Sequence, residues 1–313
     1  MVGYSSRSYL ALALVAVGCV RSVGLATRAP ESPLVGGAMS VVPPAPVVIE
    51  LTPYIGRLVR ARAAVGADTV SLLFDTGGGE TLLMPDVARR MGCSPAGRSV
   101  GIRMSGERVE FARCPAATLR LGELVVHHPA IGVFDVMALL PKGAPRLDGV
   151  LSLATFAGQT VTLDLGCRRL TVESAASAVD RTRTMRPIVV RAATGPSGSE
   201  LTLFVRVESD PLPLWFEFDS GNLARVLLSP ATASSLRVRA AASRDSAATA
   251  RVVVSGLEPL VLEVAERDLI YDGVLNAAFI ESGEFTFDLR TGKGWATLRS
   301  PSQGCPSRRS SNP

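Results

Sequence analysis

Two aspartates each follow a run of large apolar residues and precede a hydroxyl residue and a glycine. Asp75 stands in LLFDTGGGETLLMP and Asp219 in LWFEFDSG. An ionised carboxyl at the end of a buried strand costs free energy unless it is paired or used in chemistry. Two carboxyls that lie close together can share one proton, so that one accepts a proton from water while the other donates one. The two acids are therefore a candidate pair for acid–base chemistry, provided that the fold brings them together.

The segments around the two acids repeat. Before each acid the sequence predicts a strand, a tight turn and a second strand, with the turn at Gly66–Asp68 in one copy and around Ser209–Pro211 in the other. After each acid an apolar run leads to a short helix with Pro in its first turn, PDVARRMG or SPATASSL. Asp-Gly-Val-Leu then recurs at Asp148 and at Asp272, each time before two more strands. The interval between the copies is too long for a solenoid repeat, so we predict a duplicated β domain.

The repetition matters because one Asp-(Ser/Thr)-Gly triplet is ordinary turn chemistry. Two triplets at the same point of a duplicated strand–turn–helix frame are much stronger evidence. An unrelated β-sandwich with accidental triplets remains an alternative, and it would hold Asp75 and Asp219 far apart.

The repeated pattern resembles a known family. Apolar-Phe-Asp-(Thr/Ser)-Gly, an apolar run and a later Asp-Gly-hydrophobic-hydrophobic stretch resemble the aspartic peptidases of the retropepsin and pepsin type. Bacterial aspartyl-protease-family proteins with two retropepsin-like lobes in one chain are the particular likeness, over residues 48–299. The resemblance implies an all-β fold of two retropepsin-like acid-protease lobes in tandem, related by a pseudo-two-fold axis, with a cleft between them.

The resemblance also assigns roles to residues. It implies an aspartic-type endopeptidase that acts on peptides or unfolded proteins and uses neither a cofactor nor a metal ion. The shared proton is a known property of such enzymes rather than a result from this chain. Asp148 and Asp272 would support the scaffold. The six residues of the two active-site loops would be the catalytic dyad Asp75 and Asp219, the loop lock Thr76 and Ser220, and the turn residues Gly77 and Gly221.

The chain departs from the family pattern in both lobes, and in the second lobe Asn222-Leu223-Ala224 stands where a hydroxyl residue usually follows the motif. Gly78 and Gly79 stand where a hydroxyl residue usually bonds the nearby carboxylate, and Ser152 and Asn276 stand where the family usually has Gly. These departures motivate a second hypothesis, a catalytically weak or inactive peptide-binding or scaffold protein with the same fold. The segment Gly101–Phe111 predicts a hairpin that is either a flap over the cleft or an ordinary surface hairpin.

Composition narrows the remaining choices. The chain has 313 residues, 47% of them hydrophobic and 19% charged, which is typical of a globular protein. Its net charge of +5 comes from scattered arginines without a basic run or interleaved aromatics, so we expect no nucleic-acid partner. We expect a monomer in which the two lobes form an intrachain pseudo-dimer.

The N-terminus predicts export. Residues 1–26 contain a short apolar core and are interpreted as a signal peptide or a lipoprotein leader. Cys19 follows small residues and is a candidate for lipidation, which would tether the protein to a membrane. Ordinary secretion with cleavage near Ala26 is the alternative. Either way we expect a periplasmic or extracellular protein. The remaining divisions are a Pro/Gly/Ala-rich linker over 27–47, lobes over 48–177 and 186–299, and a disordered tail over 300–313.

Four further cysteines allow three disulfide pairings, and four free thiols are the alternative. Export favours disulfides, and we take Cys93 with Cys114 as the first choice because the loop between them is short. The only histidines are His127 and His128, adjacent in a predicted strand. They are interpreted as structural, and a zinc site is not expected.

Overall fold

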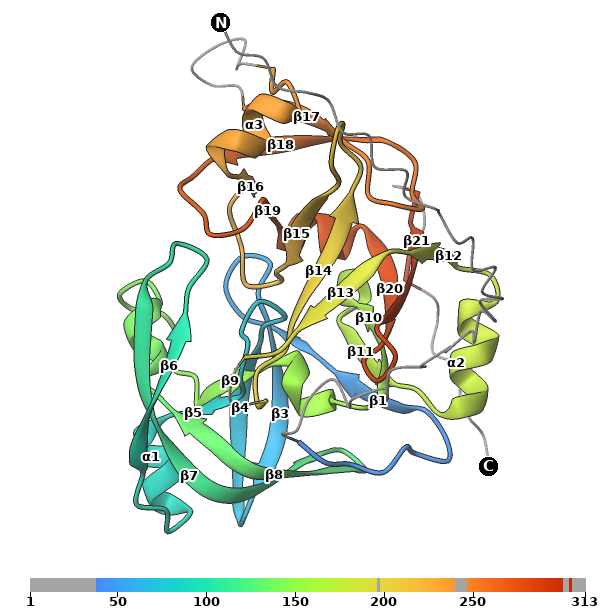
Figure 1. Cartoon of the computed structure of the whole chain (residues 1–313). Helices are drawn as coiled ribbons and strands as arrows, with labels where there is room; N and C mark the ends of the chain where they lie inside the picture. The colour runs from blue at the N-terminus through green and yellow to red at the C-terminus, as the bar shows by residue number, and fades with distance from the viewer. Residues whose placement is uncertain (1–37, 196–197, 240–246, 301–303, 306–313) are drawn as a thin grey trace, which may run out of the picture. The chain divides into compact units, whose positions relative to one another are not determined.

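Three β-sheets make up the part of the chain that the structure describes (Figure 1). The computed structural model describes residues 38–195, 198–239, 247–300 and 304–305. All of them fall within one unit, Pro33–Pro313. The predicted leader and Cys19 lie outside the described residues. Among the described residues, no helix is both long and apolar enough to cross a membrane.

The first lobe is built on an eight-stranded sheet with the order β2-β3-β4-β9-β5-β8-β7-β6. Its strands are β2 Thr52–Pro53, β3 Val59–Val65, β4 Asp68–Phe74, β5 Leu82–Leu83, β6 Ala96–Ile102, β7 Arg108–Leu121, β8 Leu124–Val133 and β9 Gly149–Leu151. The short helix α1, Pro85–Arg90, follows β5. The single-turn helices η1, Val136–Leu139, and η2, Leu153–Phe156, flank β9.

The second lobe is built on a seven-stranded sheet with the order β13-β14-β15-β19-β16-β18-β17. Its strands are β13 Val190–Ala193, β14 Thr202–Val207, β15 Leu214–Phe218, β16 Val226–Leu228, β17 Ala248–Val252, β18 Leu260–Glu266 and β19 Gly273–Leu275. Helix α3, Pro230–Ser235, follows β16, and α4, Ala277–Glu281, follows β19.

The two lobe sheets share one connection pattern, as a duplicated domain requires. In the first lobe β4 is parallel to β9, β9 is antiparallel to β5, and β5 is parallel to β8. In the second lobe β15, β19, β16 and β18 repeat these directions in the same order. Each acid follows the last residue of β4 or β15, so its loop crosses the end of the central strand. The predicted two-lobe, all-β fold is confirmed.

Alternating burial explains why these segments are strands. In β3 the side chains of Val59, Ala61, Ala63 and Val65 are buried while those between them are more exposed. This is the period of two that places one face of a strand on a core. The expected helices with Pro in the first turn are α1 and α3, and the expected turn at Gly66 joins β3 to β4.

A third sheet joins the lobes, and the repeat alone did not predict it. Its order is β1-β11-β10-β20-β21-β12, with β10 from the first half of the chain paired to β20 from the second. The Thr162 hydroxyl donates to Glu173 over 2.7 Å and lies 2.9 Å from the Thr286 hydroxyl across this junction. The strands are β1 Val47–Glu50, β10 Thr160–Asp164, β11 Arg169–Val172, β12 Arg186–Ile188, β20 Gly283–Asp288 and β21 Lys293–Leu298, and η3, Leu165–Cys167, lies between β10 and β11.

The segments outside the predicted lobes are more ordered than a tether or a plain join. Helix α2, Ala175–Thr182, lies between the halves, and its first turn is closed by a capping box of Ser174 and Ser177. In the described part of the predicted linker, Met39 exchanges two backbone hydrogen bonds with His127, at 2.8 and 2.9 Å. Residues from 38 onward are therefore attached to the first lobe.

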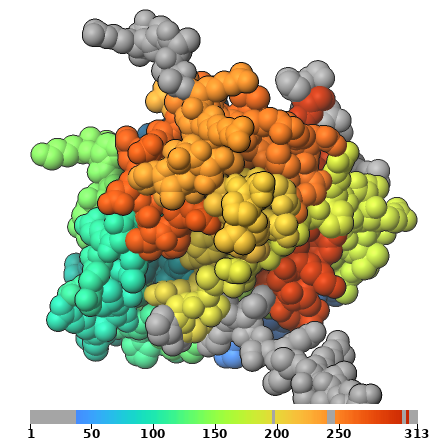
Figure 2. Space-filling view, turned by 45° about the horizontal axis from the view of Figure 1, so that its top comes forward, coloured from blue at the N-terminus to red at the C-terminus, as the bar shows by residue number. Residues whose placement is uncertain are grey.

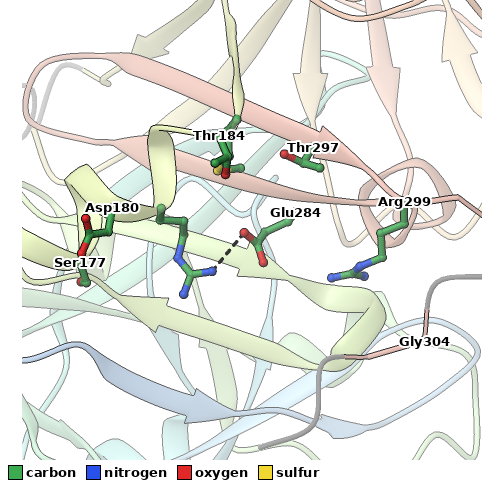
Figure 3. A pocket seen from close by; sticks show the side chains of 9 residues that line it. Ser177, Asp180, Thr184, Glu284, Thr297, Arg299 and Gly304 are labelled. Carbon is green, nitrogen blue, oxygen red and sulfur yellow. Dashed lines mark hydrogen bonds and ion pairs between the residues drawn. The ribbon is translucent and has the colours of Figure 1, made fainter. Parts of the chain in front are cut away.

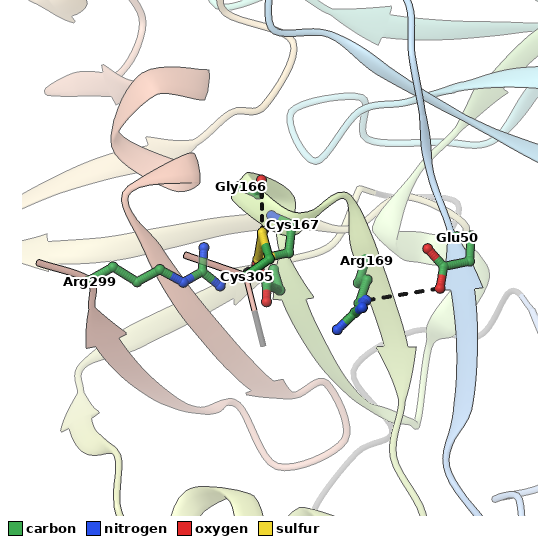
Figure 4. Close-up of a disulfide and its surroundings, with 7 residues drawn as sticks. Glu50, Gly166, Cys167, Arg169, Arg299 and Cys305 are labelled. Carbon is green, nitrogen blue, oxygen red and sulfur yellow. Dashed lines mark hydrogen bonds and ion pairs between the residues drawn. A yellow bond between two sulfur atoms is a disulfide. The ribbon is translucent and has the colours of Figure 1, made fainter. Parts of the chain in front are cut away.

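Both disulfides of the described residues tie surface segments to the sheets. Cys93 is bonded to Cys114, as expected from the short loop between them. Cys167 is bonded to Cys305, which anchors part of the predicted tail next to η3 (Figure 4). Nearby, the Arg299 guanidinium pairs with Asp164. The free-thiol alternative is excluded for these four cysteines in the structure.

Candidate active site

Asp75 and Asp219 meet between the two lobes. Their side chains are hydrogen-bonded to each other. Asp219 is 4% exposed, and Asp75 is partly exposed. The glycine of each loop faces the acid of the other: a Cβ on Gly221 would lie 2.7 Å from Asp75 Oδ1, and a Cβ on Gly77 would overlap the Asp219 carboxyl. Only glycine lets the two loops approach this closely.

Backbone N–H groups hold the two carboxylates in place. The Gly77 N–H donates to Asp75 Oδ1 over 3.0 Å, and the Gly221 N–H donates to Asp219 Oδ1 over 2.7 Å. The N–H groups of Gly78 and Gly221 also bond Asp75. Asp75 therefore has several donors even though Gly78 has no hydroxyl to offer.

The hydroxyls of Thr76 and Ser220 join the two loops. Thr76 Oγ1 accepts from the Ser220 N–H over 2.9 Å, and Ser220 Oγ accepts from the Thr76 N–H over 3.0 Å. Thr76 Oγ1 also donates to the Phe218 carbonyl over 2.6 Å, and Ser220 Oγ donates to the Phe74 carbonyl over 3.4 Å. Thr76 and Ser220 are buried, so these bonds are shielded from water. The structure thus brings together all six loop residues singled out by sequence.

Burial and mutual charge raise the pKa of both acids. Burial raises the pKa of Asp75, while the hydrogen bond from Asp219 and those from the backbone act in the opposite direction. Burial raises the pKa of Asp219 well above its ordinary value, and the charges of Asp75 and Glu217 raise it further. Because both pKa values are raised and the two carboxyls are in contact, these directions favour one proton shared by the pair.

The departures at Ser152 and Asn276 have a local structural purpose. The Ser152 side chain accepts from the Ala154 N–H over 3.2 Å and so caps η2. The Asn276 side chain accepts from the Phe279 N–H over 3.0 Å and so caps α4. Each residue begins the element that follows the central strand of its lobe, and neither is bonded to the dyad in the described structure.

The run of glycines after Asp75 lies under a loop of the second lobe. The Leu201 N–H donates to the Gly79 carbonyl over 2.8 Å. Glu80, the next residue, forms a bidentate pair with Arg113 at 2.5 and 2.7 Å, and Arg113 also donates to Ser199 of the same second-lobe loop over 3.0 Å. Gly79 is therefore part of an interlobe contact that the sequence did not reveal.

Asp148 and Asp272 support the strands that carry the dyad. Asp148 Oδ2 accepts from the Ser71 N–H over 2.9 Å, and Asp272 Oδ2 accepts from the Trp215 N–H over 2.8 Å. Ser71 and Trp215 occupy equivalent places, four residues before each catalytic candidate. The two acids therefore act in the scaffold, as the resemblance implied.

The predicted hairpin between β6 and β7 reaches the second lobe. The Ile270 N–H donates to the Met104 carbonyl at its turn over 2.9 Å, and a Cβ on Gly106 would lie 3.2 Å from Ile270 Cγ2. In the space-filling view, teal residues of the first lobe lie against orange residues of the second (Figure 2). The hairpin is thus not an isolated surface feature, as the contact of its turn with the opposite lobe demonstrates.

Glu217 is a third carboxyl beside the dyad, and sequence analysis missed its significance. It stands two residues before Asp219 on β15, so both side chains point to the same side of the chain. Burial raises the pKa of Glu217 to about 8, and the charge of Asp75 adds to the effect. Burial, followed by the charges of Glu217, Glu200 and Asp219, raises the pKa of Tyr271 to about 12. The signal in the sequence was an acid within the apolar run LWFEF.

Other parts of the structure offer less chemistry. The described residues contain no group of three or more His, Cys, Asp or Glu side chains placed to hold a metal ion. A cavity of about 650 Å³ lies beside α2, and neither dyad residue lines it (Figure 3). Two arginines line it, but each is already paired: Arg181 with Glu284 over 3.0 Å and Arg299 with Asp164.

Comparisons with known proteins agree with this architecture. Residues 61–155 match a family model described as aspartyl protease. The solved structures with a similar fold include basic 7S globulin from soybean, with 12% identity, a TM-score of 0.53, and 82% of this chain and 96% of the globulin covered. Conglutin gamma from lupine seeds has 10% identity and a TM-score of 0.51, with 82% and 96% covered.

An aspartic proteinase from Irpex lacteus is also similar, with 13% identity, a TM-score of 0.51, and 82% of this chain and 98% of the proteinase covered. No protein with curated annotation matches the sequence closely enough to count as a relative. At these identities the structural likeness shows the fold alone. The chain therefore has an aspartic-protease-like fold, with pepsin-like proteinases and seed globulins among its structural neighbours.

The loop lock gives a stability prediction. Replacing Thr76 with Val keeps the side-chain shape but removes the donor to Phe218 and leaves the buried Ser220 N–H without its acceptor. We expect Thr76→Val to lower the free energy of unfolding by about 2–4 kcal/mol in urea denaturation. Thr69→Val, at an exposed position on β4, is the matched control. Equal effects of the two substitutions would contradict the proposed lock.

Glu217 gives a pH prediction. Its pKa is about 8 in the folded chain and near the ordinary 4.5 when unfolded, so between these values the folded state binds the extra proton. Stability should therefore fall as pH rises from 6.5 to 8.5, by on the order of 2 kcal/mol for this group. Burial also raises the pKa of Glu80, to about 7, so Glu80 adds a fall in stability of the same sign in the parent protein and in a Glu217 variant alike. Glu217→Gln should flatten the dependence measured by urea denaturation.

The control for this prediction is Glu208→Gln, which removes the same charge at an exposed site paired with Arg206. It should leave the pH dependence as in the parent protein. An unchanged slope in Glu217→Gln would show that the Glu217 carboxyl does not hold a proton at neutral pH.

Proposed function

We propose that the protein is an aspartic endopeptidase that hydrolyses peptide bonds with a water molecule activated by Asp75 and Asp219. Asp75, the hydrogen-bond acceptor of the pair, would take the proton of the attacking water. Asp219 would donate its proton to the carbonyl oxygen of the scissile peptide bond. The tetrahedral intermediate would then collapse as Asp75 gives the proton it took from water to the leaving amine. One hydroxyl of the intermediate would return its proton to Asp219 as the new carboxylic acid forms, so the pair would again hold one proton.

One observation carries this proposal: a buried carboxyl of the second lobe and a partly exposed carboxyl of the first lobe are hydrogen-bonded to each other, and the pKa of each is raised. A carboxyl with a purely structural role is normally paired with a cation or accepts hydrogen bonds from backbone N–H groups. Two carboxyls in contact destabilise the fold if both are ionised, unless they share a proton. Strongly perturbed acids in such a place are typical of functional sites. The match to the aspartyl protease model covers Asp75 and supports the assignment.

The substrate class follows from the same placement. The dyad lies where the two lobes meet, and an extended peptide is a ligand that β lobes commonly bind. The hairpin between β6 and β7 touches the second lobe at Ile270, so an incoming chain would have to displace or pass beneath it. We therefore propose that a peptide or unfolded segment binds there and that the hairpin acts as a flap.

A second candidate function keeps the fold without turnover. Seed globulins are among the structural neighbours of this chain. A peptide-binding protein with a weak dyad would have the same architecture. We favour the enzyme because the departures at Ser152 and Asn276 cap η2 and α4 and leave the carboxyl pair in contact.

We also propose that the protein is exported. The disulfides Cys93–Cys114 and Cys167–Cys305 suit an oxidising compartment. A signal peptide in residues 1–26, with or without lipidation of Cys19, is the proposed route. The two Phe-Asp-(Thr/Ser)-Gly motifs further suggest kinship with bacterial aspartyl proteases of two retropepsin-like lobes.

Activity tests the proposal directly. Asp75→Asn and Asp219→Asn keep the shape of each side chain but remove the shared proton. Each should lower kcat for a denatured protein substrate by at least about a thousandfold. Asp180→Asn, at an exposed position on α2, is the control and should retain activity. Retention of more than a tenth of the activity in either dyad variant would refute the mechanism. Peptide binding without turnover in the parent protein would favour the second candidate.

A further inference from the structure

The carboxyl of Glu217 lies beside the dyad rather than in the core. Phe216 and Phe218 point to the other side of β15, where the Phe218 ring packs 5.0 Å from that of Phe285. Glu217 is opposite Phe204 on β14 and Val274 on β19, and it is 4% exposed. Its side chain is therefore held on the same side as Asp219.

Glu217 has no partner of opposite charge in the described part of the chain. No hydrogen bond or ion pair to its carboxyl is present there. Its charge raises the pKa of the Asp219 carboxyl and of the Tyr271 phenol, and neither of these groups is a cation. Its oxygens are not among the enclosed, unpaired polar side-chain atoms of the described residues, so they are not fully sealed off from solvent. A nearly buried acid in this position is destabilising unless a ligand satisfies it.

The equivalent position of the first lobe is apolar. Leu73 stands two residues before Asp75, is opposite Val150 on the central strand as Glu217 is opposite Val274, and is 7% exposed. The two sides of the dyad thus differ in one respect that a substrate would meet. One side presents a leucine and the other presents an unpaired carboxyl.

We propose that Glu217 is a specificity-determining residue that binds a basic side chain of the substrate, Lys or Arg, next to the scissile bond, while Leu73 contacts an apolar side chain on the other side of that bond. The inference rests on the proposed peptidase function. Without substrate Glu217 keeps its proton near neutral pH, because its pKa is about 8. An ammonium or guanidinium group beside it would lower that pKa, so that the proton is released to solvent, and would supply the opposite charge and the hydrogen bonds that the carboxylate lacks. A neutral substrate side chain would leave the Glu217 carboxyl without a partner, which disfavours such substrates.

Glu200 is the competing acid. It lies on the loop of the second lobe that covers Gly79, and its charge also acts on Tyr271. Burial raises its pKa, while the charge of Arg113 acts in the opposite direction. Because Arg113 already compensates Glu200, Glu217 is the better candidate for a substrate cation.

The experiment compares peptides that differ only in the charge of one side chain. Two pairs are used, Lys against norleucine and Arg against citrulline, placed in turn on each side of the scissile bond. On one side only, the parent protein should cleave the basic peptide with a kcat/KM about tenfold or more above that of its neutral counterpart. Glu217→Gln should reduce this ratio to near one, and Glu217→Leu, which copies Leu73, should reverse it.

Two charge-matched variants serve as controls. Glu208→Gln changes an exposed acid on the same lobe, and Glu200→Gln changes the competing acid. Both should keep the preference for the basic peptide. Loss of the preference in Glu200→Gln but not in Glu217→Gln would overturn the assignment.

The ratio of kcat/KM for basic and neutral peptides in the parent protein tests the inference even if a Glu217 variant fails to fold. Equal cleavage of basic and neutral peptides on both sides would overturn this inference and leave the peptidase proposal standing. Cleavage of no peptide at all would overturn the proposed function and this inference with it.

Discussion

The structure depends on the contact between two acids that would repel each other if both were ionised. Asp75 and Asp219 can lie in hydrogen-bonding contact in a largely dry site only if they share a proton, and this requirement raises their pKa values. Repulsion would separate the loops unless other interactions opposed it. The crossed hydrogen bonds of Thr76 and Ser220 do so, together with glycines that allow the close approach.

The rest of the fold serves to bring the two loops to the same point. In each lobe the acid-bearing strand and the strand after it lie on either side of a central strand, β9 or β19, so the loop between them is fixed at both ends. Asp148 and Asp272 bind the backbone four residues before each acid. The six-stranded sheet then joins the halves through β10 and β20, and it resists their separation at a distance from the dyad.

Features within one copy of the repeat could be predicted from sequence, because they depend on local periodicity and turn chemistry. The strands before each acid, the helices α1 and α3, and the pairing of Cys93 with Cys114 are of this kind. Features that arise between copies could not. The pairing of β10 with β20 and the contact of Leu201 with Gly79 depend on how the two halves meet, and neither copy encodes that separately.

The candidate site divides in the same way. The dyad, its hydroxyls and its glycines carry a motif, so sequence alone named them. Glu217 carries no motif: its importance comes from the neighbours that the strand pairing and the opposite lobe place around it. Ser152 and Asn276 depart from the family pattern in the sequence, and in the structure each one caps the start of a short helix.

The shared proton is the central claim, and NMR titration of the carboxyls tests it most directly. With ¹³C in the side-chain carboxyls of aspartate, the account predicts that Asp219 titrates well above its ordinary value, and that its pKa falls in Asp75→Asn because the neighbouring charge is gone. An Asp219 resonance that titrates near the ordinary 3.8, or that is unaffected by Asp75→Asn, would contradict the account.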